Sequence, residues 1–264
     1  MNRECSSILR SCTLLVLLVA AGCYESVPPP KLVGEARPAV RPSAALPAGR
    51  YEIVGRSVQG SPMVAQVFGN GPDITFVLAT IHGNEPAGTA LVRQLAQHLE
   101  QNPHLSADRT VVLLPVANPD GMVMSTRQNA NRVDLNRNFQ TANRVNNAES
   151  GKTALSEPET QAIHAIIDRY SPDCIVSIHS PIGCIDYDGP AYLLATRMAQ
   201  YCNLPTKTLG AKTGSLGSYA GVTLGIPTIT LELPPGESDR DSETLWLRYG
   251  KALLAAITYP EKFD

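Results

Sequence analysis

The stretch DITFVLATIHGNEPAG, residues 73–88, places an apolar run directly before a histidine and a glutamate. The run 73–79 has the length and composition of a fully buried strand. From residue 86 to residue 100, apolar side chains recur with the period of a helix. The stretch therefore predicts a strand, a short turn that carries His82 and Glu85, and a helix.

The same alternation of strands and helices continues along the chain. Residues 156–159, Ser-Glu-Pro-Glu, have the form of a capping box that would begin a helix containing Ile163, Ile166 and Ile167. This alternation favours an α/β fold, a three-layer α/β/α sandwich with a mostly parallel mixed sheet, as one domain over residues 50–264. The other expected strands are 51–58, 63–69, 110–116, 174–178 and 226–233, and the other expected helices are 190–201 and 244–257.

The first 22 residues have the layout of an export signal. Arg3 and Arg10 precede an apolar core, residues 13–21, that is too short to span a bilayer. The core is followed by Cys23 after small residues, which resembles a bacterial lipobox, so we expect Cys23 to carry a lipid after cleavage. An ordinary cleavable signal followed by a chance cysteine is the alternative.

Residues 23–49 are rich in proline and alanine and are expected to form an extended tether. A lipid at Cys23 followed by a tether predicts an exported protein that is anchored to a membrane of the cell envelope. Tyr24, rather than an aspartate, follows Cys23, which favours the outer membrane if the cell is Gram-negative.

Composition and charge favour an ordinary globular protein. Of the 264 residues, 43% are hydrophobic and 17% are charged, and the formal net charge is −2. The chain has no run of lysine or arginine that would attract a polyanion. We therefore expect no nucleic-acid partner.

Three cysteines remain beyond the signal and Cys23. Because an exported protein meets an oxidising compartment, a bridge between Cys184 and Cys202 is expected. Cys174 lies in an apolar strand pattern and is expected to be a buried free thiol.

Polar side chains follow several of the expected strands, where ligands of α/β sheets usually bind. His82 and Glu85 follow the strand 73–79, His179 follows 174–178, and Glu232 lies near the end of 226–233. Two imidazoles and one carboxylate match the ligands of hydrolytic zinc sites, which keep a fourth position for water. Taken alone, a His-x-x-Glu pair is weak evidence and would favour a helix cap or a surface histidine.

A longer set of motifs makes a resemblance specific. In order, the chain carries HGNE (82–85), NPDG (118–121), TR (126–127), NA (129–130), VDLNRNF (133–139), SIHS (177–180) and TLELP (230–234). The set resembles the carboxypeptidase A group of zinc metallopeptidases. Within that group it is most similar to the compact bacterial murein peptide amidases, whose pattern also includes YDGPA (187–191) and GSLG (214–217).

The resemblance implies roles for the ionisable residues. Glu232 would act as general base toward the attacking water and then pass the proton to the leaving amine. Arg127 would polarise the scissile carbonyl and stabilise the oxyanion, with Arg132 as the alternative for this role. The implied ligands of one Zn²⁺ ion are His82, Glu85 and His179.

The resemblance also implies how a substrate would bind. Asn136 and Arg137 would bind its free carboxylate, which the two-pronged guanidinium suits. Tyr219 lies where the family has a mobile active-site tyrosine, although a packing role is equally open. Asp186 and Asp188 follow His179 closely, and Asp188 is our candidate to receive a substrate ammonium group.

The function expected from these features is zinc-dependent hydrolysis of a peptide or amide bond near a free carboxylate. By resemblance, the substrate is a small murein peptide, and cleavage of the bond between γ-D-glutamate and meso-diaminopimelate releases diaminopimelate. The alternatives are a conventional metallocarboxypeptidase, an N-acyl amino acid deacylase and a non-catalytic binding lipoprotein. NPDG together with SIHS argues against the deacylase, and an intact Glu232 argues against the binding protein.

Overall fold

The computed structural model describes residues 49–260 of the chain. The expected signal, residues 1–22, and the expected lipid site, Cys23, lie outside these residues. Within 49–260, no helix combines the length and the apolar character that crossing a membrane requires.

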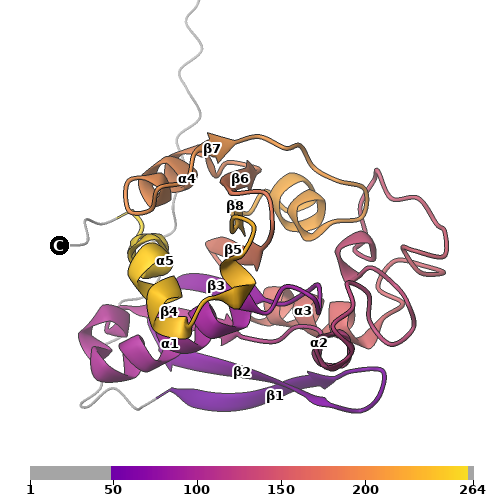
Figure 1. Cartoon of the computed structure of the whole chain (residues 1–264), viewed down its shortest axis with the longest axis horizontal. Helices are drawn as coiled ribbons and strands as arrows, with labels where there is room; N and C mark the ends of the chain where they lie inside the picture. Colours follow the sequence, from indigo (N-terminus) through magenta and orange to yellow (C-terminus); the bar gives the residue numbers. More distant parts are fainter. Residues whose placement is uncertain (1–48, 261–264) are drawn as a thin grey trace, which may run out of the picture. The chain divides into compact units, whose positions relative to one another are not determined.

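An eight-stranded mixed sheet forms the middle layer (Figure 1). The strand order is β1-β2-β4-β3-β5-β8-β6-β7. The four strands β4, β3, β5 and β8 are parallel, and antiparallel pairs flank them, β2 against β4 on one side and β6 against β8 on the other. The strands are β1 (Arg50–Arg56), β2 (Pro62–Gly69), β3 (Asp73–Ala79), β4 (Arg109–Leu114), β5 (Cys174–His179), β6 (Cys184–Asp188), β7 (Thr206–Lys207) and β8 (Thr228–Glu232).

Helices cover both faces of the sheet, and the predicted α/β sandwich is confirmed (Figure 1). Successive side chains of a strand point to opposite faces, so in β3 Val77 and Ala79 pack in one core while Phe76 and Leu78 pack in the other. The first core contains α1 (Ala87–Gln101), α4 (Tyr192–Ala199) and α5 (Ser242–Ile257), and the second contains α3 (Pro158–Tyr170) and the π-helix η3 (Gly217–Thr223). The short helices are α2 (Pro119–Met124), η1 (Pro103–Ser106), η2 (Leu135–Arg137) and η4 (Glu237–Asp239).

The turn after β3 packs backbone against backbone on α2. A Cβ atom at Gly83 would lie 1.9 Å from the carbonyl carbon of Gly121, so only glycine permits this approach. Asn118 caps α2 by accepting a hydrogen bond from the Gly121 N–H (2.9 Å), and it donates to the Ile81 carbonyl oxygen (3.1 Å). These contacts explain why HGNE and NPDG occur together, because the second motif fixes the turn formed by the first.

The predicted capping box at residues 156–159 is wrong. Glu157 is the N-cap of α3, and it makes no side-chain capping hydrogen bond. Glu159 is fully buried and accepts hydrogen bonds from the Val58 N–H (3.1 Å) and the Asn129 side chain (3.0 Å). Val58 and Asn129, which lie outside α3, thus donate to the Glu159 carboxylate that the capping box would have used.

The predicted bridge between Cys184 and Cys202 is also wrong, because both are free thiols. Cys184 is buried at the start of β6, where it pairs with Glu232 of β8. The Cys202 Sγ atom instead points to the carbonyl oxygen of Met198, 3.6 Å away. The predicted buried free thiol at Cys174 is confirmed, and burial raises its pKa to about 12.

Candidate metal centre and substrate pocket

The ends of three neighbouring strands bring the predicted metal ligands together. β5 and β8 are parallel, and their register places His179 beside Glu232. β3 pairs with the other edge of β5, so the turn after β3 carries His82 and Glu85 to the same end of the sheet. Four side chains from three segments that are far apart in sequence therefore meet at the carboxyl ends of these strands.

His82, Glu85 and His179 form a compact buried cluster. The Nδ1 atom of His82 lies 2.7 Å from Glu85 Oε1, and the Nδ1 atom of His179 lies 3.0 Å from Glu85 Oε2. The two Nδ1 atoms are 3.1 Å apart, and one possible ligand atom from each residue lies within 4.8 Å of the others. None of the three residues is more than 6% exposed. Two ring nitrogens and a carboxylate that converge in this way can hold a metal cation.

The other nitrogen of each imidazole has a partner that orients the ring. His82 Nε2 lies 3.2 Å from Asp134 Oδ1, and His179 Nε2 lies 3.0 Å from Ser177 Oγ. An ionised carboxylate can only accept a hydrogen bond, so Asp134 keeps a proton on His82 Nε2. The Nδ1 atom of His82 is thereby left free to bind a metal.

Carboxylates in the cluster remain ionised despite their burial. Burial alone would raise the pKa of Glu85, but its hydrogen bonds with His179 and His82 lower the pKa to about 2. The pKa of Asp134 also lies below its usual range, because the hydrogen bond with His82 and the charge of Arg127 outweigh burial. The site therefore presents two fixed negative charges to a cation at neutral pH.

Glu232 lies beside the cluster at the end of β8 and is 9% exposed. Its Oε2 atom is buried, and no described residue forms a hydrogen bond with it. Burial raises the pKa of Glu232; nearby His179 opposes this effect, and Glu85 adds to it. A carboxyl group with raised proton affinity and a vacant oxygen is suited to exchange a proton with a bound reactant.

Arg127 reaches the cluster from the segment that follows α2. Its Nε–H donates to Asp134 Oδ2 (2.9 Å), which holds the guanidinium group in place. Its Nη1 atom lies 3.3 Å from His82 Nδ1 and 3.7 Å from Glu85 Oε1. Arg132 is exposed and does not line the pocket beside the cluster. The structure thus brings Arg127, rather than Arg132, to the candidate metal site.

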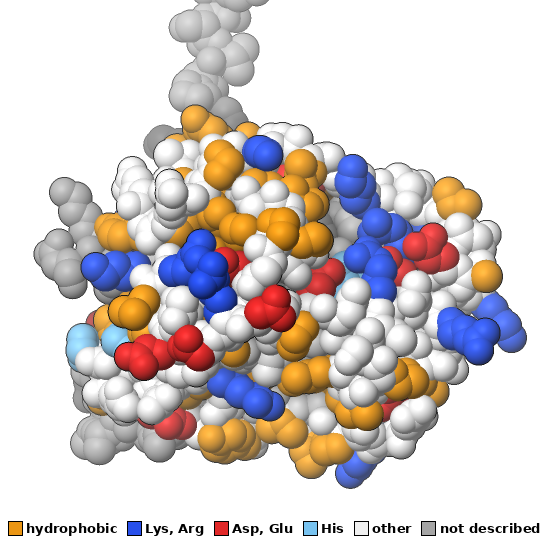
Figure 2. All heavy atoms as spheres, in the orientation of Figure 1, with side chains coloured by type: hydrophobic (Ala, Val, Ile, Leu, Met, Phe, Trp, Pro, Cys, Tyr) orange, Lys and Arg blue, Asp and Glu red, His pale blue; other side chains and the backbone are white. Residues whose placement is uncertain are grey.

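A pocket of 210 Å³ opens beside the cluster. Figure 2 shows basic, acidic and histidine side chains gathered near the centre of this face, next to hydrophobic ones. Asn136 Oδ1 accepts a hydrogen bond from the Leu216 N–H (2.9 Å), which ties the turn of Asn136 and Arg137 to the segment before η3. The predicted site residues that line the pocket are His82, Glu85, Arg127, Asn136, Arg137, His179, Asp188 and Glu232.

Asp186 and Asp188 form the acidic part of the pocket wall. Both lie on β6, which the sequence did not predict as a strand. Asp186 Oδ1 accepts a hydrogen bond from the Leu209 N–H (2.7 Å). A Cβ atom at Gly217 would lie 2.0 Å from Asp188 Oδ2, so a larger residue where η3 passes this carboxylate would displace it. Burial raises the pKa of Asp188 to about 6, and Asp186 adds to the effect.

Tyr219 is the predicted site residue that the structure does not bring to the pocket. It is 6% exposed and belongs to the core on the α3 face of the sheet. Its ring stacks against Phe139 and His164, with centroid distances of 5.7 and 5.5 Å. Tyr219 therefore lies where a packing residue would, and not in the pocket.

Comparison with known proteins identifies the family. The family described as zinc carboxypeptidase matches residues 48–187, which include all three candidate ligands. The chain belongs to this family. Membership of this family makes it a zinc metallopeptidase. Its His-Glu-His cluster supplies the two imidazoles and one carboxylate that can bind zinc in such enzymes.

Relatives of the metallopeptidase include bacterial amidases. Murein peptide amidase A of Escherichia coli K12 is 36% identical over 218 residues, which cover 75% of this chain and 87% of that protein. The corresponding protein of Vibrio campbellii is 33% identical, covering 70% and 79% of the two chains. The crystal structure of the murein-tripeptide amidase of E. coli O157 aligns with a TM-score of 0.67 at 34% identity, over 83% of this chain and 96% of that one. Carboxypeptidase A of Helicoverpa armigera has the same fold at 21% identity, with a TM-score of 0.67 over 81% and 70% of the chains.

Sequence reasoning missed the two side chains that orient the candidate metal ligands. Asp134 is the aspartate of the VDLNRNF motif, and Ser177 is the first serine of SIHS. Both stand inside recognised motifs, so the motifs themselves were the available signal. Their contacts with the imidazoles give these positions a physical role in the metallopeptidase.

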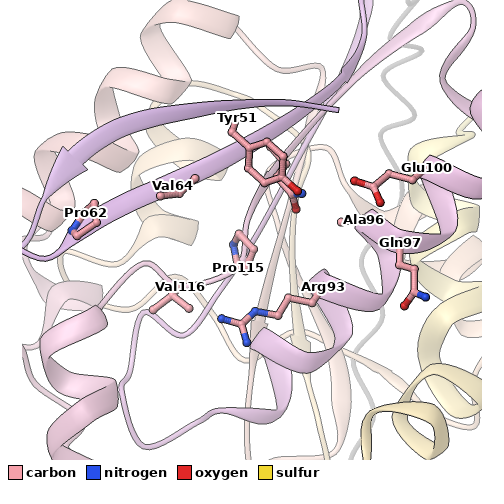
Figure 3. Close-up of a pocket in the computed structure, with 10 residues that line it drawn as sticks. Tyr51, Pro62, Val64, Arg93, Ala96, Gln97, Glu100, Pro115 and Val116 are labelled. Atoms are coloured by element: carbon pink, nitrogen blue, oxygen red, sulfur yellow. The ribbon is translucent and has the colours of Figure 1, made fainter. Parts of the chain in front are cut away.

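A second cavity of 450 Å³ lies between the β1–β2 pair and α1, away from the metal centre (Figure 3). Tyr51, Val64, Arg93 and Glu100 are among the side chains around it. None of the predicted site residues lines this cavity.

We predict that Asp134→Asn lowers the affinity for zinc by about 10- to 100-fold, because the amide no longer fixes the His82 tautomer with a full negative charge. Competition with a chromophoric chelator measures this affinity. Asp168→Asn is the matched control, because Asp168 contacts His164 (3.1 Å) at an exposed position on α3. Equal affinities for zinc in the two variants would contradict the orienting role of Asp134.

Proposed function

We propose that the metallopeptidase uses one zinc ion to hydrolyse small murein peptides. The bond cleaved joins γ-D-glutamate to meso-diaminopimelate, and the product released is diaminopimelate. The observation that carries the proposal is the pocket, which has Arg137 and the buried carboxylate of Asp188 beside the His-Glu-His cluster. The names of the bacterial relatives, murein peptide amidase and murein-tripeptide amidase, support the same substrate class.

Glu232 carries the proton in this reaction. A zinc ion held by His82, Glu85 and His179 would supply Lewis-acid chemistry, which activates water and polarises a carbonyl group. Glu232 takes a proton from the attacking water on its vacant Oε2 atom and returns it to the nitrogen of the leaving amine. The C–N bond breaks as that nitrogen is protonated and leaves as an amine. Glu232 has then given up the proton that it took from water and is ionised again.

Arg127 stabilises the charge that develops on the carbonyl oxygen. Its Nε–H is committed to Asp134, and its Nη1 atom faces the ligand cluster. The guanidinium group is therefore oriented before the substrate arrives and needs little reorganisation during the reaction.

Substrate charges select the bond to be cleaved. Arg137 and Asn136 bind the α-carboxylate of the leaving residue, for which a guanidinium is the best protein partner. Asp188 binds the side-chain ammonium group of diaminopimelate. No hydrogen bond to the Asp188 carboxylate is found among the described residues, so its oxygens are available to that group.

The proposal is tested by product analysis on L-Ala-γ-D-Glu-meso-diaminopimelate, with and without a chelator. We expect wild type to release free diaminopimelate, the chelator to stop release, and Glu232→Gln to lower kcat by about 10²- to 10⁴-fold while zinc stays bound. Glu243→Gln, at an exposed position of α5, is the matched control and should retain wild-type activity.

Other substrates separate the alternative functions. Faster release of the last residue from an ordinary dipeptide would identify a conventional metallocarboxypeptidase. Turnover of acyl-aspartate or succinyl-glutamate alone would identify a deacylase. Zinc binding without any turnover would identify a binding protein and refute the proposal.

The pKa of Asp188, about 6, gives the proposal a pH signature. Above pH 6 the carboxylate is charged and binds the ammonium group, and below pH 6 protonation removes this attraction. The measurement is the ratio of kcat/KM for the diaminopimelate tripeptide to kcat/KM for the 2-aminopimelate analogue, which lacks the side-chain ammonium. The ratio should fall by roughly tenfold for each pH unit below 6. It should be low and independent of pH in Asp188→Asn; the same pH dependence in that variant would refute the assignment.

We further propose that the enzyme is exported and is anchored by a lipid on Cys23 to the outer membrane of the cell envelope. A short signal, small residues before Cys23 and a proline-rich segment after it support this location. Cys23→Ser should move the protein from the membrane fraction to the soluble fraction of the envelope, whereas Cys12→Ser should not. Unchanged membrane association of Cys23→Ser would contradict the lipid anchor.

A further inference from the structure

Lys212 places a second cation on the wall of the substrate pocket. It lies on the loop between β7 and η3, together with Leu209 and Gly210, which also line the pocket. Its side chain is exposed, and its ammonium group donates to the carbonyl oxygen of Leu209 (3.1 Å). Among the described residues it forms no ion pair within 4.0 Å.

The loop that carries Lys212 is fastened to its surroundings. The Leu209 N–H donates to Asp186 Oδ1 (2.7 Å), at the start of the loop. The Lys212 carbonyl oxygen accepts a hydrogen bond from Ser218 Oγ, and Asn143 Nδ2 donates to the carbonyl oxygen of Ala211 (3.3 Å). Lys212 is therefore held at the pocket by contacts of its own backbone and of the residues that precede it.

The ammonium group of Lys212 acts on the acidic wall of the pocket without pairing with it. Burial raises the pKa of Asp188 and of Asp186, and the positive charge of Lys212 lowers both in part. All three residues line the same pocket, and Lys212 forms no ion pair within 4.0 Å with either carboxylate. The pocket thus offers the cation of Lys212, on the loop before η3, and the anion of Asp188, on β6.

We infer that Lys212 and Asp188 together form a subsite for a side chain that ends in an amino acid zwitterion. Lys212 binds the side-chain carboxylate, and Asp188 binds the ammonium group on the same carbon atom. The inference rests on the proposed function, in which Arg137 already binds the α-carboxylate at the cleaved bond. Lys212 is then a specificity-determining residue, which separates diaminopimelate from lysine at this position.

The test compares wild type with Lys212→Met on two substrates. The substrates are L-Ala-γ-D-Glu-meso-diaminopimelate and the tripeptide with L-lysine in its place, which keeps the ammonium group and lacks the side-chain carboxylate. In Lys212→Met, the ratio of kcat/KM for diaminopimelate to kcat/KM for lysine should fall by about tenfold, mainly through KM, because a charge-assisted hydrogen bond is lost. Lys212→Arg, which keeps the charge, should restore part of this ratio.

Lys251→Met is the matched control, because Lys251 is exposed on α5 and does not line the pocket. Its substrate ratio should equal that of wild type. An unchanged ratio in Lys212→Met, including an equal fall on both substrates, would overturn the inference and leave the proposed function standing. Failure of wild type to cleave either tripeptide would instead refute the proposed function.

Discussion

The candidate metal centre depends on one fully buried carboxylate, that of Asp134. It is bound at once by His82 Nε2, by Arg127 Nε–H and by the backbone N–H of Asn136. One side chain thereby orients a candidate metal ligand, fixes the guanidinium group that faces the ligand cluster, and begins the turn of Asn136 and Arg137 that lines the pocket. Such a charge is tolerated in the interior only because its oxygens have donors.

The sheet register is the second constraint; the sequence predicts the positions of the main strands and a mostly parallel sheet, but not the order or the register of the strands. Long apolar runs such as β3 and β5 have clear patterns, and the rule that ligands gather at the carboxyl ends of strands leads directly to His82, Glu85 and His179. The parallel pairing then places Glu232 beside His179. Short-range patterns and this rule of topology therefore predict where polar residues gather, whereas the candidate metal ligands are assigned by the resemblance of the motifs to zinc metallopeptidases.

Other features depend on tertiary partners that no local pattern reveals. Glu159 has the spacing of a capping residue, yet Asn129 and Val58 supply its hydrogen bonds. The strand β6 contains two aspartates, so it lacks an apolar pattern, although pairing with β8 makes it a strand. Tyr219 stands at a motif position suited to an active site, but it stacks against Phe139 and His164, which are distant in sequence.

The free thiols of Cys174, Cys184 and Cys202 bear on how the domain matures. With no covalent cross-link in the described fold, the sheet and its two apolar cores hold the chain together in either redox environment. Folding then requires no oxidation catalyst. Residues 49–260 can therefore reach the described fold in a reducing cytosol as well as in an oxidising compartment.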